Sequence, residues 1–377
     1  MKEIKDIIEA YETALTNQQG MALATVVKVE GSSYRQAGAR MLVTDDGRLT
    51  GAISGGCLEG DALKKALLSI HQRTNKLITY DTTHEENASL GVQLGCNGIV
   101  HILFEYINPE QDNHPLSLLK RALQQRVEAV LVTLFSLKHK NDQVGTVLLS
   151  LDDASLIGPQ GDLDLTFLQA DIQQARRNKK SHLKICTLNG LDHEALIEFI
   201  APVLRLYSIG AGNDVKPLVE SADIMGWECH VIDGRATHAL AARFPKAHMV
   251  TLSSSADLCK TLDVDPYTVF ALMTHNYSYD IAALEFALNS PTPYIGVLGP
   301  KSKLSRMFTD LSQAGIVLDD SAKARIYGPL GLDIGAETAE EIAIAIVAEI
   351  KAVMSGRNGH SLKFLPHKIH TAIEIMP

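Results

Sequence analysis

Two cysteines in the N-terminal third of the chain stand in glycine-rich segments, where a thiol is open to chemistry. Cys57 follows Gly55 and Gly56 and comes at the start of a stretch with apolar residues at helical spacing, while Cys96 has a glycine just before it and another two residues after it. At the start of a helix, the positive end of the helix dipole favours the thiolate form of Cys57. The alternative for each cysteine is a small buried hydrophobe. Because two such cysteines occur in one short region, we favour a chemical role.

A polar loop between two expected strands carries groups that suit an anionic ligand. It holds Ser32, Ser33 and Arg35, and Arg40 begins the strand that follows. Hydroxyl and guanidinium groups donate hydrogen bonds to carboxylate or phosphate oxygens. The loop therefore predicts an anion pocket, with solvated loop charges as the alternative.

A second glycine-rich turn lies between an expected strand and an expected helix in the C-terminal half. Gly210 and Gly212 permit a tight turn and a close approach of a ligand to the backbone, as in dinucleotide-binding folds. Asp233, 21 residues after Gly212, lies where an acid would reach a ribose hydroxyl. Val215 replaces the third glycine of that fingerprint, and Asp214 puts a negative charge beside the helix start, where it would cap the helix or repel a pyrophosphate. The turn thus indicates a Rossmann-type fold more strongly than it indicates NAD.

Two further polar loops follow expected strands of the same half. His275 and Asp280 form a candidate acid–base pair, and Lys301 starts a helix with a cationic, hydroxyl-bearing first turn suited to a phosphate. Open α/β sheets bind ligands at the carboxyl ends of their strands. The alternative is that these are ordinary polar loop residues.

The composition limits the class of protein. The 377 residues are 46% hydrophobic and 21% charged, as in globular proteins with two or three domains. The net charge of −9 argues against broad nucleic-acid binding. There is no run of about 20 apolar residues to span a membrane, and the N-terminal residues do not resemble a targeting peptide. We expect a cytoplasmic protein with reduced thiols and no structural zinc site, since the sequence has no zinc-type spacing of cysteine and histidine.

The hydrophobic pattern predicts an α/β protein with an N-terminal α+β domain and a C-terminal Rossmann-type domain with a doubly wound parallel sheet. We place the N-terminal domain at 1–200, with 110–200 as a middle extension, the Rossmann-like domain at 201–355 and a tail at 356–377. Residues 190–202 are expected to connect the two halves. In the second half, strands alternate with helices, and the expected strands are 204–209, 229–232, 249–252, 269–273 and 294–298.

Several of these segments together resemble the XdhC/CoxI family, accessory proteins of molybdenum hydroxylases such as xanthine dehydrogenase. The matching segments share glycine-rich or cysteine-bearing motifs. They are Gly31–Val43, Ile53–Glu59, Leu94–Cys96, Ile209–Asp214 with Pro217 and Leu218, Met273–His275 with Asp280, and Gly331–Gly335 with Glu341 and Ile342.

The resemblance implies a chaperone that binds the molybdenum cofactor, molybdopterin with its metal, and hands it to a xanthine dehydrogenase-type hydroxylase. A cysteine desulfurase partner would supply the terminal sulfur of the cofactor. The resemblance further implies that Cys57 and Cys96 hold or sense the cofactor, as soft thiolates able to contact molybdenum.

Two alternatives of other classes stay open. One is an NAD(P)-dependent oxidoreductase that uses the Rossmann-type half, and the other is a dithiol redox protein that uses Cys57 and Cys96. The C-terminal domain could also hold a nucleotide, and a homodimer is one option for the oligomeric state.

Overall fold

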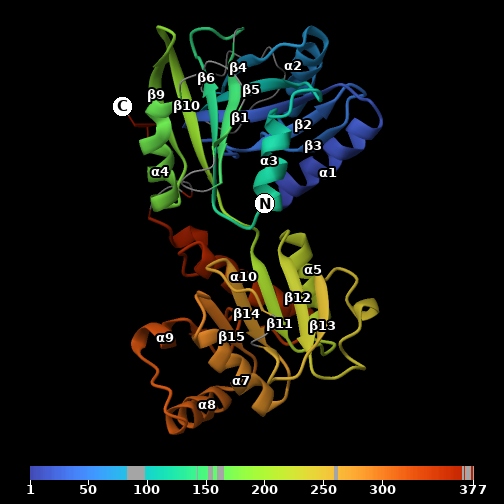
Figure 1. The fold of residues 1–377 in the computed structure, drawn as a ribbon, viewed down its shortest axis with the longest axis vertical. Coiled ribbons are helices and arrows are strands. Elements are labelled where there is room, and N and C mark those ends of the chain that lie inside the picture. The colour runs from blue at the N-terminus through green and yellow to red at the C-terminus, as the bar shows by residue number, and fades with distance from the viewer. Residues whose placement is uncertain are drawn as a thin grey trace. The chain divides into compact units, whose positions relative to one another are not determined.

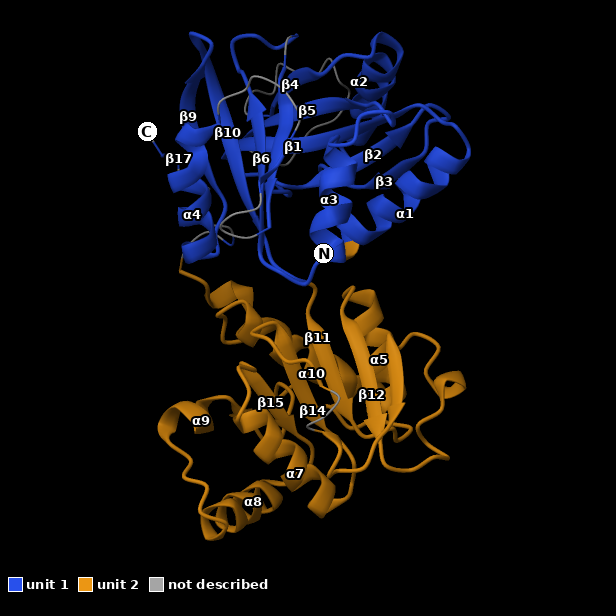
Figure 2. Cartoon of the chain, viewed as in Figure 1, with its two compact units in different colours: residues 1, 3–202, 368–377 blue, residues 2, 203–367 orange. Residues whose placement is uncertain are grey.

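The chain folds into two compact units, 3–202 with the C-terminal segment 368–377, and 203–367 (Figure 2). The computed structural model describes residues 1–82, 98–141, 143–151, 156–158, 165–258, 262–366, 369 and 375–376. Among the helices it describes, none is both long and apolar enough to cross a membrane.

The first unit contains two sheets. The five-stranded sheet has the order β3-β2-β1-β5-β4, and every neighbouring pair is antiparallel. Its strands are β1 (Met21–Gly31), β2 (Arg40–Thr44), β3 (Leu49–Gly51), β4 (Lys76–Asp81) and β5 (Gly98–Ile107). The six-stranded sheet has the order β17-β9-β10-β6-β7-β8. Its strands are β6 (Ala129–Phe135), β7 (Gly145–Ser150), β8 (Leu156–Ile157), β9 (His182–Leu188), β10 (Leu191–Ile200) and β17 (Ile375–Met376).

Helices and a shared core hold these two sheets together (Figure 1). Apolar side chains of β1 alternate in direction, so Ala22 and Ala24 pack towards α2 while Leu23 packs towards α1 and α3. Helix α4 covers the outer face of β6 and β10. The helices of the unit are α1 (Lys2–Thr16), α2 (Glu59–Gln72), α3 (Pro115–Gln124) and α4 (Gln169–Asn178), with a short 3₁₀ turn at Thr166–Leu168.

The second unit is a parallel sheet in the order β13-β12-β11-β14-β15-β16 (Figure 1). In chain order this is 3-2-1-4-5-6, the order of the Rossmann fold. The strands are β11 (Arg205–Ile209), β12 (Glu228–Asp233), β13 (Met249–Leu252), β14 (Thr268–Leu272), β15 (Tyr294–Val297) and β16 (Ile326–Tyr327). The predicted strand–helix alternation is confirmed.

Helices cover both faces of this sheet, so the expected doubly wound architecture is also confirmed. Helices α5 and α10 pack on one face, and α7 and α8 pack on the other. The helices are α5 (Val215–Ile224), α7 (Tyr277–Leu288), α8 (Lys301–Gln313), α9 (Asp320–Ala324) and α10 (Ala339–Met354), with 3₁₀ turns at Ala241–Arg243 and Leu362–Phe364. The hydroxyl of Thr338 and the carboxylate of Glu341 form a capping box at the start of α10.

The structure corrects two expectations about connecting segments. Residues 190–202 are not a simple connection, because β10 runs through them and pairs with both β6 and β9. Charged residues such as Glu194 and Glu198 obscure its strand pattern, since they are satisfied by partners inside the unit. The expected tail at 356–377 contains a short strand, because β17 pairs with β9, whereas the side chains of Phe364 and Ile369 are exposed.

A buried ion pair joins the two sheets of the first unit. The guanidinium of Arg40 on β2 donates to both carboxylate oxygens of Glu198 on β10 and to the carbonyl of Gly38, 2.9 Å away. The Arg40 side chain is only 2% exposed. Gly38 has a φ of +93°, and an added Cβ would lie 2.9 Å from the Glu198 carboxylate. The pair therefore fixes the end of the Gly31–Gly38 loop against the second sheet.

A second carboxylate, that of Glu105 on β5, is buried between the sheets. The backbone N–H and the hydroxyl of Thr146 donate to it over 2.6 and 3.0 Å. Burial raises the pKa of Glu105 to about 7, although these hydrogen bonds and the charge of Arg40 act in the opposite direction. The native state therefore binds a proton here more tightly than the unfolded chain does.

Removing one partner of the Arg40–Glu198 pair should strongly destabilise the protein. Glu198→Ala leaves a buried guanidinium without its counter-ion, which costs about 3–5 kcal/mol in the free energy of unfolding. The matched control is Asp192→Ala, which breaks the exposed Lys138–Asp192 pair and should leave stability nearly unchanged. Urea unfolding measures both variants, and equal losses would contradict a structural role for the buried pair.

Stability should also depend on pH through Glu105. Between the unfolded pKa near 4.5 and the folded value of about 7, the native state holds the extra proton, so the free energy of unfolding falls as the pH rises. Glu105→Gln removes this pH dependence. Between pH 4 and 8, its free energy of unfolding should therefore rise relative to that of wild type by up to about 3 kcal/mol. Denaturant unfolding across that range checks it, with the exposed Glu110→Gln as control. Parallel pH profiles for Glu105→Gln and wild type would refute the assignment.

Candidate functional site

The turn that carries Cys57 is organised by the hydroxyl of Ser54. The Ser54 Oγ accepts hydrogen bonds from the backbone N–H groups of Gly56, Cys57 and Leu58, at 3.1–3.2 Å. Gly56 has a φ of +108°, a conformation that side-chain-bearing residues rarely adopt. The turn is therefore a preformed loop rather than part of the helix, and α2 begins two residues after Cys57, at Glu59.

Glu59, the first residue of α2, closes the same turn. Its carboxylate accepts from the backbone N–H groups of Ser54 and Leu58 at 2.9 and 3.1 Å, and from the Ser54 hydroxyl at 2.5 Å. Burial alone would raise the pKa of Glu59, but these hydrogen bonds from Ser54 and the backbone lower it below its ordinary value. The carboxylate is therefore ionised at neutral pH.

The thiol of Cys57 stands at the end of a short hydrogen-bonded chain. Its Sγ lies 3.5 Å from the Ser54 Oγ, which in turn donates to Glu59. The thiol is partly exposed. By contrast, burial raises the pKa of Cys186 and raises that of Cys229 to about 12. Among the described cysteines, Cys57 is thus the thiol best placed for chemistry, while Cys96 and Cys259 lie outside the described residues.

The Gly31–Gly38 loop lies beside this turn. The ring of Tyr34 contacts Gly55, where an added Cβ would be 3.4 Å from the ring. Gly98 packs against the backbone of Ser32 so closely that a Cβ would approach the Ser32 carbonyl to 2.3 Å. Three segments far apart in sequence therefore meet around Cys57 and Ser32.

The arginines of this loop both have carboxylate partners. Arg35 donates to the two carboxylate oxygens of Glu3 over 2.5 Å, and the pair is partly exposed. Arg40, expected in an anion pocket with Ser32 and Ser33, is instead buried against Glu198. The structure corrects that expectation, because the Arg40 guanidinium is buried and its charge is already neutralised by the Glu198 carboxylate.

The glycine-rich turn of the second unit is held by the polypeptide itself. Gly210 has a φ of +126°, and a Cβ there would meet the Met273 carbonyl at 2.4 Å, so glycine is required for packing on β14. Arg243 donates to the Ala211 carbonyl at 2.7 Å and to the Asn213 side chain at 3.0 Å. Gly212 lies next to the Asp214 carboxylate, which would contact an added Cβ at 2.2 Å.

Asp233, expected near a ribose hydroxyl, is contacted by donors of the protein itself. Its side chain is buried, and four donors surround its two oxygens: the backbone N–H groups of Ala211 and Arg235 and two groups of the Arg235 guanidinium, at 2.7–2.9 Å. Burial raises the pKa of this carboxyl, but these hydrogen bonds lower it overall. A carboxylate has about four acceptor positions, and here all are filled. Asp233 therefore stabilises the glycine-rich turn through its hydrogen bond with the Ala211 backbone.

The expected His275–Asp280 pair does not form. The imidazole Nε2 of His275 lies 3.3 Å from the Asp214 carboxylate, and the side chain is mostly exposed. This contact also replaces the expected cap, since the Asp214 side chain makes no capping hydrogen bond to α5. The fully buried Asp280 instead accepts from Thr274 and from Lys303, whose Nζ lies 2.6 Å away. Lys301 is exposed at the first position of α8.

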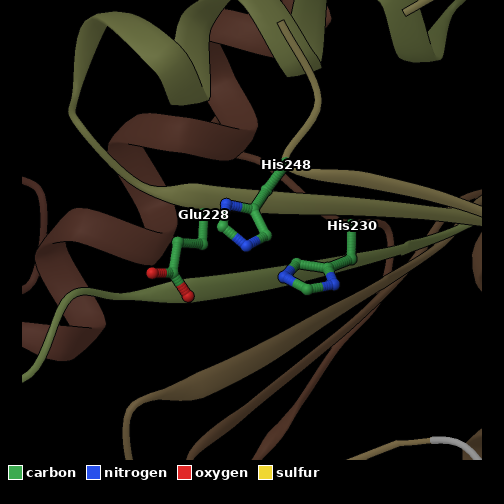
Figure 3. Close-up of side chains that lie close together, drawn as sticks. All are labelled: Glu228, His230 and His248. Carbon is green, nitrogen blue, oxygen red and sulfur yellow. The ribbon is translucent and has the colours of Figure 1, made fainter. Parts of the chain in front are cut away.

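One cluster of possible metal ligands was not predicted from the sequence. One potential ligand atom from each of Glu228, His230 and His248 lies within 4.8 Å of the others (Figure 3). The sequence signal was the Glu-x-His spacing on a strand, which puts both side chains on one face. The third residue comes from the start of the neighbouring strand and could not be assigned without the fold.

Comparison with known proteins gives the class and the family. Residues 206–350 match the model of the XdhC Rossmann domain, and residues 14–81 match that of the XdhC and CoxI family. A protein of Bacillus subtilis 168, named as a probable subunit of xanthine dehydrogenase, is 31% identical over 344 residues, 90% of this chain and 94% of that one. The chain therefore belongs to the XdhC and CoxI family.

Two further relatives span nearly the whole chain. A molybdenum cofactor insertion chaperone of Escherichia coli K12, PaoD, is 23% identical over 93% of this chain and 88% of its own. A protein from Bacillus halodurans, described as a xanthine dehydrogenase, is 29% identical in sequence. Its crystal structure superposes with a TM-score of 0.74 and covers 95% of this chain and 98% of that one.

The position of Cys57 predicts selective labelling. Substoichiometric iodoacetamide at pH 7.5 should modify Cys57 before Cys186 and Cys229, because burial raises the pKa of the latter two and so depletes their thiolates. Peptide mass spectrometry measures the modified fraction of each. In urea the differences should disappear, and Cys229 reacting first in the native protein would contradict the assignment.

Proposed function

We propose that the protein binds molybdenum cofactor as cargo and delivers it to a xanthine dehydrogenase-type molybdenum hydroxylase. The observation that carries the proposal is the preformed turn around Cys57, with a partly exposed thiol hydrogen-bonded to Ser54. The family membership and the similarity to an insertion chaperone support it. In this role the protein needs tight, reversible binding rather than turnover.

The chemistry of the Cys57 turn suits such a cargo. A thiolate is a soft ligand for molybdenum, and the Ser54–Glu59 chain offers the thiol proton an acceptor when a ligand approaches. The ring of Tyr34, largely exposed beside Gly55, is available to stack on the flat pterin of the cofactor. Cys96 is proposed as a second thiol on the family resemblance.

The anionic groups of the cargo need donors. In the first unit, the hydroxyls of Ser32 and Ser33 and the guanidinium of Arg35 are the candidates, although a phosphate would compete with Glu3 for Arg35. In the second unit, Lys301 and His275 are exposed basic residues at the carboxyl edge of the sheet. We propose that this edge holds a phosphate or a nucleotide.

The contacts around Asp233 argue against the alternative of an NAD(P)-dependent oxidoreductase. A ribose hydroxyl would have to displace Arg235 from a carboxylate that already has four donors. The bound-cargo proposal does not need this displacement. A cysteine desulfurase that supplies the terminal sulfur, and a homodimer, are further parts of the proposal.

Cargo binding should depend on Cys57. When the protein is co-expressed with the cofactor biosynthesis enzymes, Cys57→Ser should copurify with about tenfold less molybdenum and pterin, since a soft metal ligand is lost. Molybdenum analysis and pterin fluorescence measure the yield. Transfer is then followed as activation of a cofactor-free hydroxylase.

The matched control is Cys186→Ser, a partly exposed cysteine on β9, which should load as wild type does. A dinucleotide titration tests the oxidoreductase alternative in parallel. If Cys57→Ser keeps the full load of molybdenum and pterin, the proposed role of the thiol is wrong. If the wild-type protein binds NAD at micromolar concentration but no pterin, the proposed function fails.

A further inference from the structure

Two histidines and a glutamate meet at the amino end of the parallel sheet in the second unit. Glu228 and His230 are the first and third residues of β12, and His248 immediately precedes β13 (Figure 3). The carboxyl edge with the Gly210–Asp214 turn is the opposite end of the same strands. The cluster is therefore separate from the proposed cargo site.

The pairing of β12 with β13 brings the backbones of these residues close together. His230 and Met249 are partners in the parallel β12–β13 pair, and the backbone N–H of His248 donates to the Cys229 carbonyl at 2.7 Å. His248 stands just before β13 and is not bound by the alternation of that strand, so its ring can lie on the same face as that of His230. The two imidazole rings stack with centroids 5.0 Å apart and an angle of 29°.

We propose that this cluster is a binding site for a divalent transition-metal cation, with Zn²⁺ the best match. One ligand atom from each of the three residues lies within 4.8 Å of the other two. Ligand atoms about 2.0–2.2 Å from one zinc ion stand roughly 3.4 Å apart in a tetrahedron. Side-chain movements of about 1 Å therefore suffice to close the site.

The donor set selects the kind of ion. Two imidazole nitrogens and one carboxylate oxygen suit zinc and its first-row neighbours, with a fourth position left for water. Calcium and magnesium prefer sets made of oxygen alone. The imidazole of His230 is buried and that of His248 is exposed, so the site has a fixed base and an open side through which an ion can enter.

The surrounding charges favour a cation. The carboxylate of Glu228 lies 3.6 Å from the Nε of Arg205, which also contacts Asp263 at 3.3 Å. Two carboxylates thus face one guanidinium. Arg205 keeps Asp263 as a partner when the Glu228 carboxylate turns to an ion.

A bound ion would hold the edge strand of the sheet in place. His248 ends the segment that follows β12, and this segment carries Arg235 and Arg243, which hold Asp233 and the glycine-rich turn. The ion ties the far end of that segment to β12. Zinc binding to the native state alone must also stabilise it.

The test uses the full chain, free of any histidine tag and stripped of metal with a chelator. Zinc is titrated in competition with a chromophoric chelator, and the melting temperature is followed with and without zinc. Wild type should bind one ion at this site and melt higher. His248→Ala and Glu228→Gln should each weaken binding by about tenfold or more, because each removes one of three protein ligands.

Two matched controls separate this site from others. His360→Ala removes an exposed histidine outside the cluster, and Cys57→Ser removes the partly exposed thiol of the first unit; both should retain the zinc site and the rise in melting temperature. Millimolar magnesium should not displace zinc. The proposal is overturned if wild type binds no zinc, or if His248→Ala, folded as judged by circular dichroism, binds as wild type does. A zinc anomalous peak away from these three residues would have the same consequence.

Discussion

Carboxylates that are wholly or partly buried in this fold need hydrogen-bond donors from the protein, and this constraint shapes both candidate sites. Where access of water is restricted, backbone N–H groups and cationic side chains supply the hydrogen bonds. Glu59 does this for the turn before α2 and Asp233 does it for the turn after β11. Each acid closes a glycine-rich loop whose backbone donors would otherwise lack acceptors. The loops are therefore rigid before any ligand arrives.

The parts of the structure that the sequence could predict depend on local patterns. The strand–helix alternation after residue 203 reflects burial on both faces of a parallel sheet, which depends on composition and period alone. The hairpin at Asp45–Gly47 and the Thr338 capping box are likewise local signals, and both appear in the structure. Local chemistry was enough in these cases because the interacting residues are neighbours in sequence.

Side-chain partners from distant segments could not be predicted from the sequence. The guanidinium of Arg40 could bind an anionic ligand, but Glu198, 158 residues later, neutralises its charge. Asp280 lies close to His275 in sequence, yet it bonds Lys303 while His275 contacts Asp214. A sequence gives the charge of a side chain but not whether another segment has already neutralised it. The metal-type cluster was missed for the converse reason, since its third member joins only through the pairing of β12 with β13.

These pairings leave few chemically available groups, which narrows the function. Once Arg40, Asp233, Asp280 and Lys303 are assigned to the framework, the described residues offer the Cys57 thiol and the Ser32–Arg35 loop in the first unit. In the second unit, His275 and Lys301 remain at one end of the sheet and the Glu228–His230–His248 cluster at the other. A soft thiol in a preformed loop, with hydroxyls nearby, is suited to holding a metal-bearing ligand, and this is why we propose a carrier of molybdenum cofactor.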